Sequence, residues 1–291
     1  MHPGRHKMNV FARSWTVTKM SFSVVRQDPE MLLFPAISGF FSTLFSIAML
    51  FPGFIAVWMD GGDVGFGPLQ LVTAFVSYFG LAFFATFSNV CVVHTTRTRL
   101  NGGDATFGES ISFAMSRLPH ILAWSAISAS VGVLLRLLQN AAERSSGVGR
   151  VVAQVLQSVL GLAWTVVSLF VVPAMVYDNV GPVDGLKRSV EVLKRTWGES
   201  LIRHYGMGLM TFLGSLPGVA LIVVGMFAFG VSATLAVALI VAGGLWIGAA
   251  VFFFGLLNAV YNVGLYHYAT QGHRAPPGFD PAALRGAFGQ R

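Results

Sequence analysis

The sequence predicts an all-α protein, a polytopic bundle of six transmembrane helices joined by short connections. Charged residues make up only 11% of the chain, against 54% hydrophobic residues, whereas a soluble domain carries about 25% charged residues. The hydrophobic residues also gather in stretches long enough to cross a bilayer, which takes about 20 apolar residues. These six stretches are 32–58, 69–93, 120–138, 151–177, 207–229 and 232–261.

Three of the stretches have features of their own. The first follows a basic flank and is too long for the apolar core of a signal peptide, so we expect an uncleaved span with a kink at Pro52. Pro217 and Gly218 interrupt the fifth stretch and could make it a discontinuous helix. The sixth lies in an apolar run from 231 to 268, which predicts a tilted helix because that length exceeds the bilayer thickness.

Lysine and arginine residues are divided unevenly between the two sides of this bundle. The N-terminal segment, the second and fourth connections and the C-terminal tail hold 16 of the 19. Because such residues accumulate on the cytoplasmic side, we expect a multi-pass protein of the bacterial inner membrane with both termini in the cytoplasm. The net charge of +7 then reflects topology and attraction to anionic lipid headgroups rather than nucleic-acid binding.

The stretches also indicate an internal repeat of three hairpins. Each of three basic segments begins with an amphipathic stretch and leads into two spans. The chain therefore reads as a single membrane domain, 1–291, made of units at about 8–95, 104–178 and 182–268, with a cytoplasmic tail at 269–291. Because every hairpin begins and ends on the same side, the units are parallel, which predicts a pseudo-threefold axis along the membrane normal.

The amphipathic stretch of the third unit shows its pattern most clearly. Apolar residues at 186, 190, 193 and 197 share one helix face. Such a helix lies in the membrane interface with its apolar side against the acyl chains, or it docks on its own bundle. Its other face carries the residues that we expect to contact anionic lipid, namely Lys187, Arg188, Lys194 and Arg195.

Ionisable residues recur at the cytoplasmic ends of the even-numbered spans. His94, Asp178 and His267 hold equivalent places in the three units, so the predicted axis would bring them to one depth. Two histidines and a carboxylate are a ligand set for a divalent metal, although residues at span ends are also ordinary interfacial residues or caps. With His120 and His204, which begin the third and fifth spans, they could instead ring a polar cytoplasmic vestibule. No other cofactor is indicated.

Three asparagines place polar groups within or near the hydrocarbon. Asn89, Asn258 and Asn262 would bond across helices or contact a substrate. No charged residue falls at the middle of a stretch, which argues against an ion-coupled transporter. Glycine pairs at 214/218 and 244/248 permit close helix packing, either within the chain or in a homo-oligomer.

Four segments of the chain carry a resemblance to known proteins. They are Arg13-Ser14-Trp15 before Leu32-Leu33-Phe34-Pro35; Leu100-Asn-Gly-Gly-Asp104; Trp124 with Gly132 and Leu134-Leu135-Arg136; and Val172-Pro-Ala-Met-Val-Tyr-Asp178 followed by Gly185-Leu-Lys-Arg-Ser189 and Trp197-Gly198-Glu199. On these segments the chain resembles a bacterial and archaeal family of integral membrane proteins of unknown function. The last segment is also similar to the membrane domains attached to some glycerophosphodiester phosphodiesterases. The resemblance implies a six-helix bundle and supplies no activity.

These observations favour a non-enzymatic protein, since the chain contains no HExxH, GxSxG or Walker motif. We expect a scaffold, membrane-organising module or accessory subunit whose amphipathic helices contact lipid. One alternative is a small transporter or channel with the cytoplasmic vestibule. A second is an intramembrane metal-dependent enzyme with His94, Asp178 and His267 as its ligands.

Overall fold

The computed structural model describes residues 10–59, 67–197, 206–230 and 232–271. All regular structure in these residues is helical, which confirms the predicted all-α class. A short 3-10 helix, η1 (Pro29–Leu32), precedes the second α-helix. The α-helices are α1 (Val10–Gln27), α2 (Leu33–Met59), α3 (Pro68–Leu100), α4 (Phe107–Ser116), α5 (Leu118–Arg144), α6 (Gly147–Val167), α7 (Val171–Tyr177), α8 (Pro182–Trp197), α9 (Gly206–Ala228) and α10 (Ala233–Thr270).

Each of the six predicted spans corresponds to a helical segment long and apolar enough to cross a membrane. Helices α2, α3, α5, α9 and α10 form five of them, and α6 with α7 forms the fourth span along the chain. The discontinuity expected at Pro217 and Gly218 is wrong, because α9 continues through both residues. The fourth span is broken instead, at residues 168–170. The protein thus has the six candidate spans of a multi-pass membrane protein.

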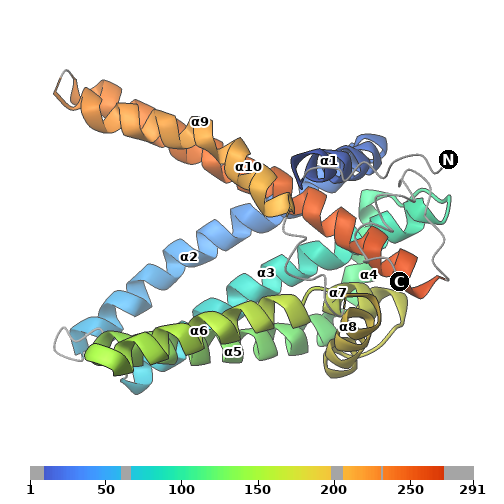
Figure 1. Cartoon of the computed structure of the whole chain (residues 1–291), viewed down its shortest axis with the longest axis horizontal. Helices are drawn as coiled ribbons and strands as arrows, with labels where there is room; N and C mark the ends of the chain where they lie inside the picture. The colour runs from blue at the N-terminus through green and yellow to red at the C-terminus, as the bar shows by residue number, and fades with distance from the viewer. Residues whose placement is uncertain (1–9, 60–66, 198–205, 231, 272–291) are drawn as a thin grey trace, which may run out of the picture.

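The helices gather at one end of the molecule and diverge toward the other (Figure 1). Helices α1, α4, α7 and α8 pack around the ends of α3 and α10, and we call this end the head. Helix α5 runs beside α3 and α6 runs beside α5, whereas α9 pairs with α10 in a separate hairpin, which we call the arm. The stretches predicted to be amphipathic form α1, α4 and α8, each placed before two spans.

The arm is held together by close contact between two helix backbones. A Cβ atom added to Gly218 of α9 would lie 2.7 Å from the carbonyl oxygen of Gly243 on α10. Only glycine permits this approach, as expected where small residues face each other in a membrane. The predicted pair 214/218 therefore packs within the chain. Gly244 and Gly248 have nothing within 4 Å of an added Cβ, so a homo-oligomer through that pair stays a prediction.

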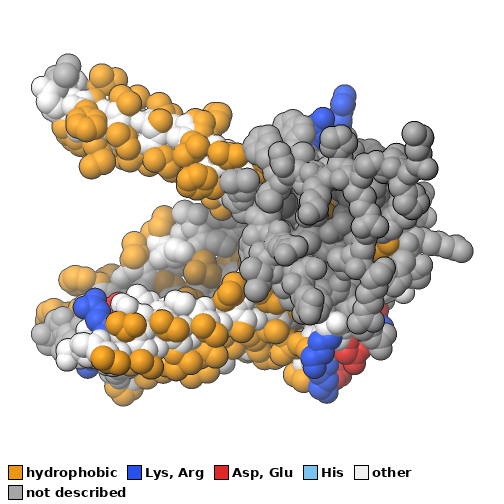
Figure 2. Space-filling view, in the orientation of Figure 1, with side chains coloured by type: hydrophobic (Ala, Val, Ile, Leu, Met, Phe, Trp, Pro, Cys, Tyr) orange, Lys and Arg blue, Asp and Glu red, His pale blue; other side chains and the backbone are white. Residues whose placement is uncertain are grey.

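Buried side chains concentrate in the head and where the spans enter it. Met31, Cys91, Phe170 and Tyr266 are completely buried there. The arm and α2 expose large apolar side chains along their length, as the space-filling view shows for the arm (Figure 2). Lipid chains are as apolar as these residues. The exposed faces are therefore the surface expected of helices in a bilayer.

Candidate functional site

A cavity of about 420 Å³ lies at the point from which α2 and α10 diverge. Its walls come from residues 35–39 of α2, 85–92 of α3, 251–262 of α10 and the break between α6 and α7. Figure 2 shows a wide hollow between the arm and the other helices, with hydrophobic side chains along both sides. The volume falls in the range of small-molecule sites, about 300–1,000 Å³.

Three asparagines supply most of the polar groups in this cavity. Asn258 and Asn262 lie one turn apart on α10, and Asn89 reaches the cavity from α3. None of the three side chains forms a hydrogen bond with another residue in the described ranges, although the expectation was bonding across helices. Ser38, in contrast, donates its hydroxyl to the Phe84 carbonyl at 2.8 Å. The cavity therefore contains amide groups that are available to a ligand.

The break in the fourth span forms one wall of the cavity. Leu169 and Pro173 line it, and Pro173 has no N–H to offer the Leu169 carbonyl four residues earlier. No donor in the described part of the chain bonds that carbonyl. The break is supported from outside, because the buried Phe170 N–H donates to the Ser189 hydroxyl of α8 at 3.2 Å. Helix α8 thus fixes the wall from the side facing away from the cavity.

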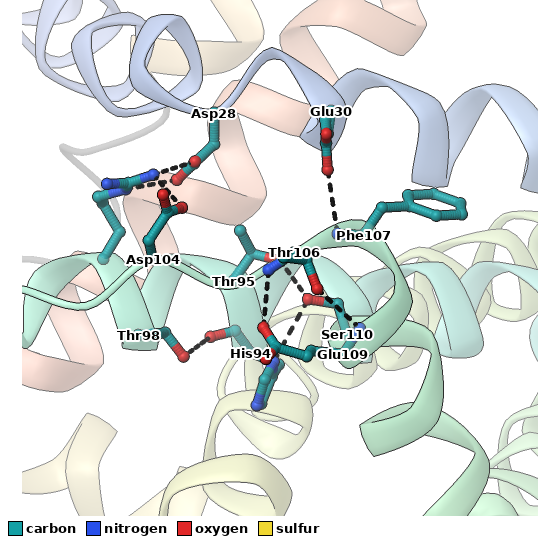
Figure 3. Close-up of polar contacts among 11 residues, drawn as sticks. Asp28, Glu30, His94, Thr95, Thr98, Asp104, Thr106, Phe107, Glu109 and Ser110 are labelled. Carbon is teal, nitrogen blue, oxygen red and sulfur yellow. Dashed lines mark hydrogen bonds and ion pairs between the residues drawn. The ribbon is translucent and has the colours of Figure 1, made fainter.

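The polar residues of the head, in contrast, bond to one another (Figure 3). Arg99, at the end of α3, donates from Nε and from Nη2 to Asp28, with the Nε bond at 2.6 Å. Its Nη2 also donates to Asp104 at 2.6 Å. These bonds join the segment between α1 and η1 to the turn after α3. The Glu30 carboxylate accepts the Phe107 N–H at 3.0 Å and so joins η1 to α4.

Helix α4 begins with a reciprocal cap. The Thr106 hydroxyl accepts the Glu109 N–H at 3.3 Å, while the Glu109 carboxylate accepts the Thr106 N–H at 2.9 Å. The bond from the Thr106 backbone lowers the pKa of the exposed Glu109 carboxyl below its ordinary value. The cap fixes the start of α4, whose Ser110 and Phe113 contact His94 of α3.

His94, His267 and Asp178 each have their own partners in the head. His94 Nδ1 lies 3.3 Å from the Ser110 hydroxyl, and His267 Nδ1 lies 3.4 Å from the Tyr177 hydroxyl. The Asp178 carboxylate accepts the Tyr266 hydroxyl at 2.6 Å and the Arg188 guanidinium at 3.0 Å. Adjacent residues of α7 and α10 thus make two parallel contacts that tie these helices together.

The predicted metal ligands do not form a cluster. Within the described ranges, no three His, Cys, Asp or Glu side chains lie close enough to hold a metal ion. His120 is near the start of α5, and its buried Nδ1 has no hydrogen-bond partner in the part of the chain that the structure describes. His204 falls outside that part. The candidate ligand-binding residues therefore divide: Asn89 and Asn262 meet in the cavity, whereas the described ionisable candidates lie in the head.

The four predicted lipid-contacting cations of α8 differ in their surroundings. Lys187 pairs with Asp184 at 2.9 Å, and Arg188 bonds to Glu191 and Asp178, whose carboxylates raise its pKa. The Lys194 side chain is exposed, and the Arg195 side chain lies outside the described part. Lys187 and Lys194 are therefore the described cations of this set that do not bond to another helix.

Comparison with known proteins places the chain in a family. A match to a family of unknown function, DUF6159, covers residues 69–276. The chain belongs to the DUF6159 family. No protein in the curated set compared with this chain matches it significantly. The predicted similarity of the fourth span to phosphodiesterase membrane domains stays a prediction, because the family match shows no phosphodiesterase domain.

Two segments that carried the resemblance have clear structural roles in this DUF6159 protein. Residues 100–104 turn the chain from α3 toward α4, with Gly102 at a φ of +81°, which favours glycine. In the segment 185–189, Gly185 lets α8 approach α7, since an added Cβ would lie 3.3 Å from the Val171 carbonyl oxygen. Ser189 then reaches the helix break. The motif therefore secures a wall of the cavity.

Sequence reasoning missed the helix break and the meeting of the three asparagines. Pro173 was a usable signal for the break, because proline removes a donor to the residue four positions earlier. No local sequence pattern indicates that the three asparagines meet. Asn89 and Asn262 are far apart in the chain, and only the packing of α3 and α10 around the break brings them to one cavity.

Proposed function

We propose that this protein is a non-enzymatic, lipid-binding protein that holds a lipid molecule at the junction of α2 and the arm. In this role it organises membrane lipid or serves as an accessory subunit of a membrane complex. The observation that carries the proposal is the cavity, whose walls are largely apolar and continue into the exposed apolar faces of α2 and α10. In a bilayer, acyl chains fill such a space.

The chemistry of the cavity supports lipid rather than an ion or a charged metabolite. The described lining contains no Asp, Glu, Lys or Arg, whereas sites for ions and charged substrates at membrane depth contain such groups. Phe40 and Phe51 of α2 are 62% and 70% exposed, and Trp246 of the arm is 51% exposed. Large apolar side chains exposed on both α2 and the arm suit acyl chains that extend from a head group in the cavity.

The arrangement in the membrane is part of the same proposal. The head faces the cytoplasm of a bacterium, with both termini on that side, because the basic segments flank the helices that form it. Helices α1, α4 and α8 lie along the interface, and Lys187 and Lys194 contact anionic headgroups. The three hairpins are copies of one repeated unit, and a pseudo-threefold axis relates them to one another.

The experiment fills the cavity with a side chain and measures lipid contact. Gly255 lines the cavity and has nothing within 4 Å of an added Cβ, so Gly255→Trp places an indole there. Gly244 is equally open but lies outside the cavity, so Gly244→Trp is the matched control. The protein is placed in nanodiscs that contain a phospholipid with a photoreactive acyl chain, and crosslinked peptides are mapped by mass spectrometry.

We expect crosslinks on residues 37–44 and 251–258 in the parent protein and in Gly244→Trp, and their loss in Gly255→Trp. Crosslinks on the outer face of α6, where Val152 and Leu162 are exposed, report general contact with the bilayer and should not change. Equal labelling of the cavity walls in all three proteins would overturn the proposal.

A second candidate is a transporter for the same ligand, and the helix break favours it. Broken helices line the substrate sites of many secondary transporters, and here the break forms a cavity wall. A cysteine at Ser88 would react with an aqueous thiol reagent in a transporter and stay unreactive in a lipid-filled scaffold. The native Cys91 is completely buried and gives little background.

A further inference from the structure

We infer that the cavity recognises an uncharged lipid head group that carries a free hydroxyl, through the amides of Asn89, Asn258 and Asn262. This inference rests on the proposed function, because it names the class of lipid held at the same site. The three side chains share one cavity and have no hydrogen-bond partner among the described residues.

No charged side chain lines the cavity within the described ranges, which argues against a phosphate-bearing head group. Buried anions are held by Arg or Lys, usually through paired charge-assisted hydrogen bonds, and neither type is among the described residues that line this cavity. A cationic head group would need a carboxylate, and the described lining contains none. The ion-pairing groups of this region are in the head, where Arg99 and Arg188 already bond to carboxylates.

The hydrogen-bonding capacity of the wall matches a hydroxyl group. Each asparagine amide offers two donor hydrogens and one acceptor oxygen, and a hydroxyl can donate and accept at once. Asn258 and Asn262 approach from one helix face and Asn89 from another helix, so a small polar head can bond to two helices together. The Leu169 carbonyl at the break is a further acceptor without a donor.

The three amides need a hydrogen-bonding partner on energetic grounds. An amide removed from water without a hydrogen bond is unfavourable by about 1–3 kcal/mol on mutational scales. Transmembrane helices ordinarily avoid this loss by bonding polar side chains across helices. Here the asparagines face a cavity of about 420 Å³ rather than a neighbouring polar group. A neutral polar head satisfies them, and its chains continue into the apolar hollow beyond.

The experiment compares three lipids that share their acyl chains. The full-length protein is placed in phosphatidylglycerol nanodiscs doped with diacylglycerol, with the same diacylglycerol acetylated at its hydroxyl, or with phosphatidic acid. Lipid that stays on the released protein is counted by native mass spectrometry. The variants are Asn258→Leu with Asn262→Leu, and Asn89→Leu as an independent change on another helix. Asn140→Leu is the control, since Asn140 lines a separate pocket of about 270 Å³ between α2, α3 and α5.

We expect the parent protein and Asn140→Leu to retain diacylglycerol about tenfold better than its acetylated form, as the loss of one or two hydrogen bonds predicts. Both cavity variants should lose that preference. Equal retention of the two lipids, preference for phosphatidic acid, or a preference that survives in the variants would overturn the inference.

The two proposals fail separately. If Gly255→Trp abolishes crosslinking of ordinary phospholipid while no preference for a free hydroxyl exists, the site holds acyl chains and only the head-group inference is wrong. If Gly255→Trp changes nothing, the cavity holds no lipid and both proposals are wrong.

Discussion

The head holds Asp28, Arg99 and Asp104 in one ion-pair cluster, whereas the cavity holds three asparagines with no partner among the described residues. Both regions place polar groups next to apolar packing. In the head every one of these charges bonds to a neighbouring element, so the polar groups define how the helices meet. In the cavity the amides are left to face an opening.

This contrast distinguishes polar groups that hold the helices together from polar groups that are available to a ligand. Asn89 and Asn262 are partly buried and Asn258 is exposed in the protein. Polar side chains in a bilayer ordinarily bond across helices, so a set without partners among the described residues calls for an explanation. The contacts of the head fix the turn after α3 and the start of α4 (Figure 3). Nothing comparable fixes the asparagines. Substitutions should therefore have opposite consequences in the two regions, and three of them test this.

The largest effect is expected in the head, from Arg99→Met. This change keeps the aliphatic stem and removes the charge, which leaves Asp28, 8% exposed, without its cation. Loss of one partner of a largely buried ion pair should lower the free energy of unfolding by about 2–4 kcal/mol. Thermal unfolding in detergent, followed by tryptophan fluorescence, measures the change.

Arg26→Met is the control, because Arg26 is exposed at the end of α1 and has no ion-pair partner among the described residues. Its unfolding temperature should match the parent protein. An equal loss of stability in both variants would mean that the Arg99 cluster is no more than ordinary surface charge.

How much of each region the sequence predicts depends on whether the contacts join residues that are near or distant in the chain. The six spans follow from local hydrophobicity, and all six are present. The head contacts join residues such as Asp28 and Arg99 that are distant in the chain, and no periodicity encodes them. His94, Asp178 and His267 do hold similar places at span ends, yet each meets a different neighbour. Local equivalence in a repeat does not determine which side chains converge.

An intermediate effect is expected at the helix break, where the head meets the cavity. Ser189→Ala removes the acceptor of the buried Phe170 N–H. Loss of this buried hydrogen bond between the helix break and α8 should lower the free energy of unfolding by about 1 kcal/mol. Ser125→Ala is the matched control, since Ser125 is equally buried but its hydroxyl donates to the Ile121 carbonyl of its own helix. That change removes no contact between two helices, and similar losses in the two variants would show that the Ser189 contact does not support the break.

The smallest effect on stability is expected in the cavity, from Asn262→Leu in lipid-depleted detergent. Leucine has nearly the shape of asparagine and no polar atoms, so it relieves an unsatisfied amide without opening a void. The free energy of unfolding should stay within about 0.5 kcal/mol of the parent value or rise above it. A loss of more than about 1 kcal/mol would show that Asn262 contributes to the fold itself, as Arg99 does. Added diacylglycerol should raise the unfolding temperature of the parent protein and of Arg99→Met, because both keep the three asparagines. It should leave the unfolding temperature of Asn262→Leu unchanged, because this variant lacks one of the groups that we assign to ligand binding.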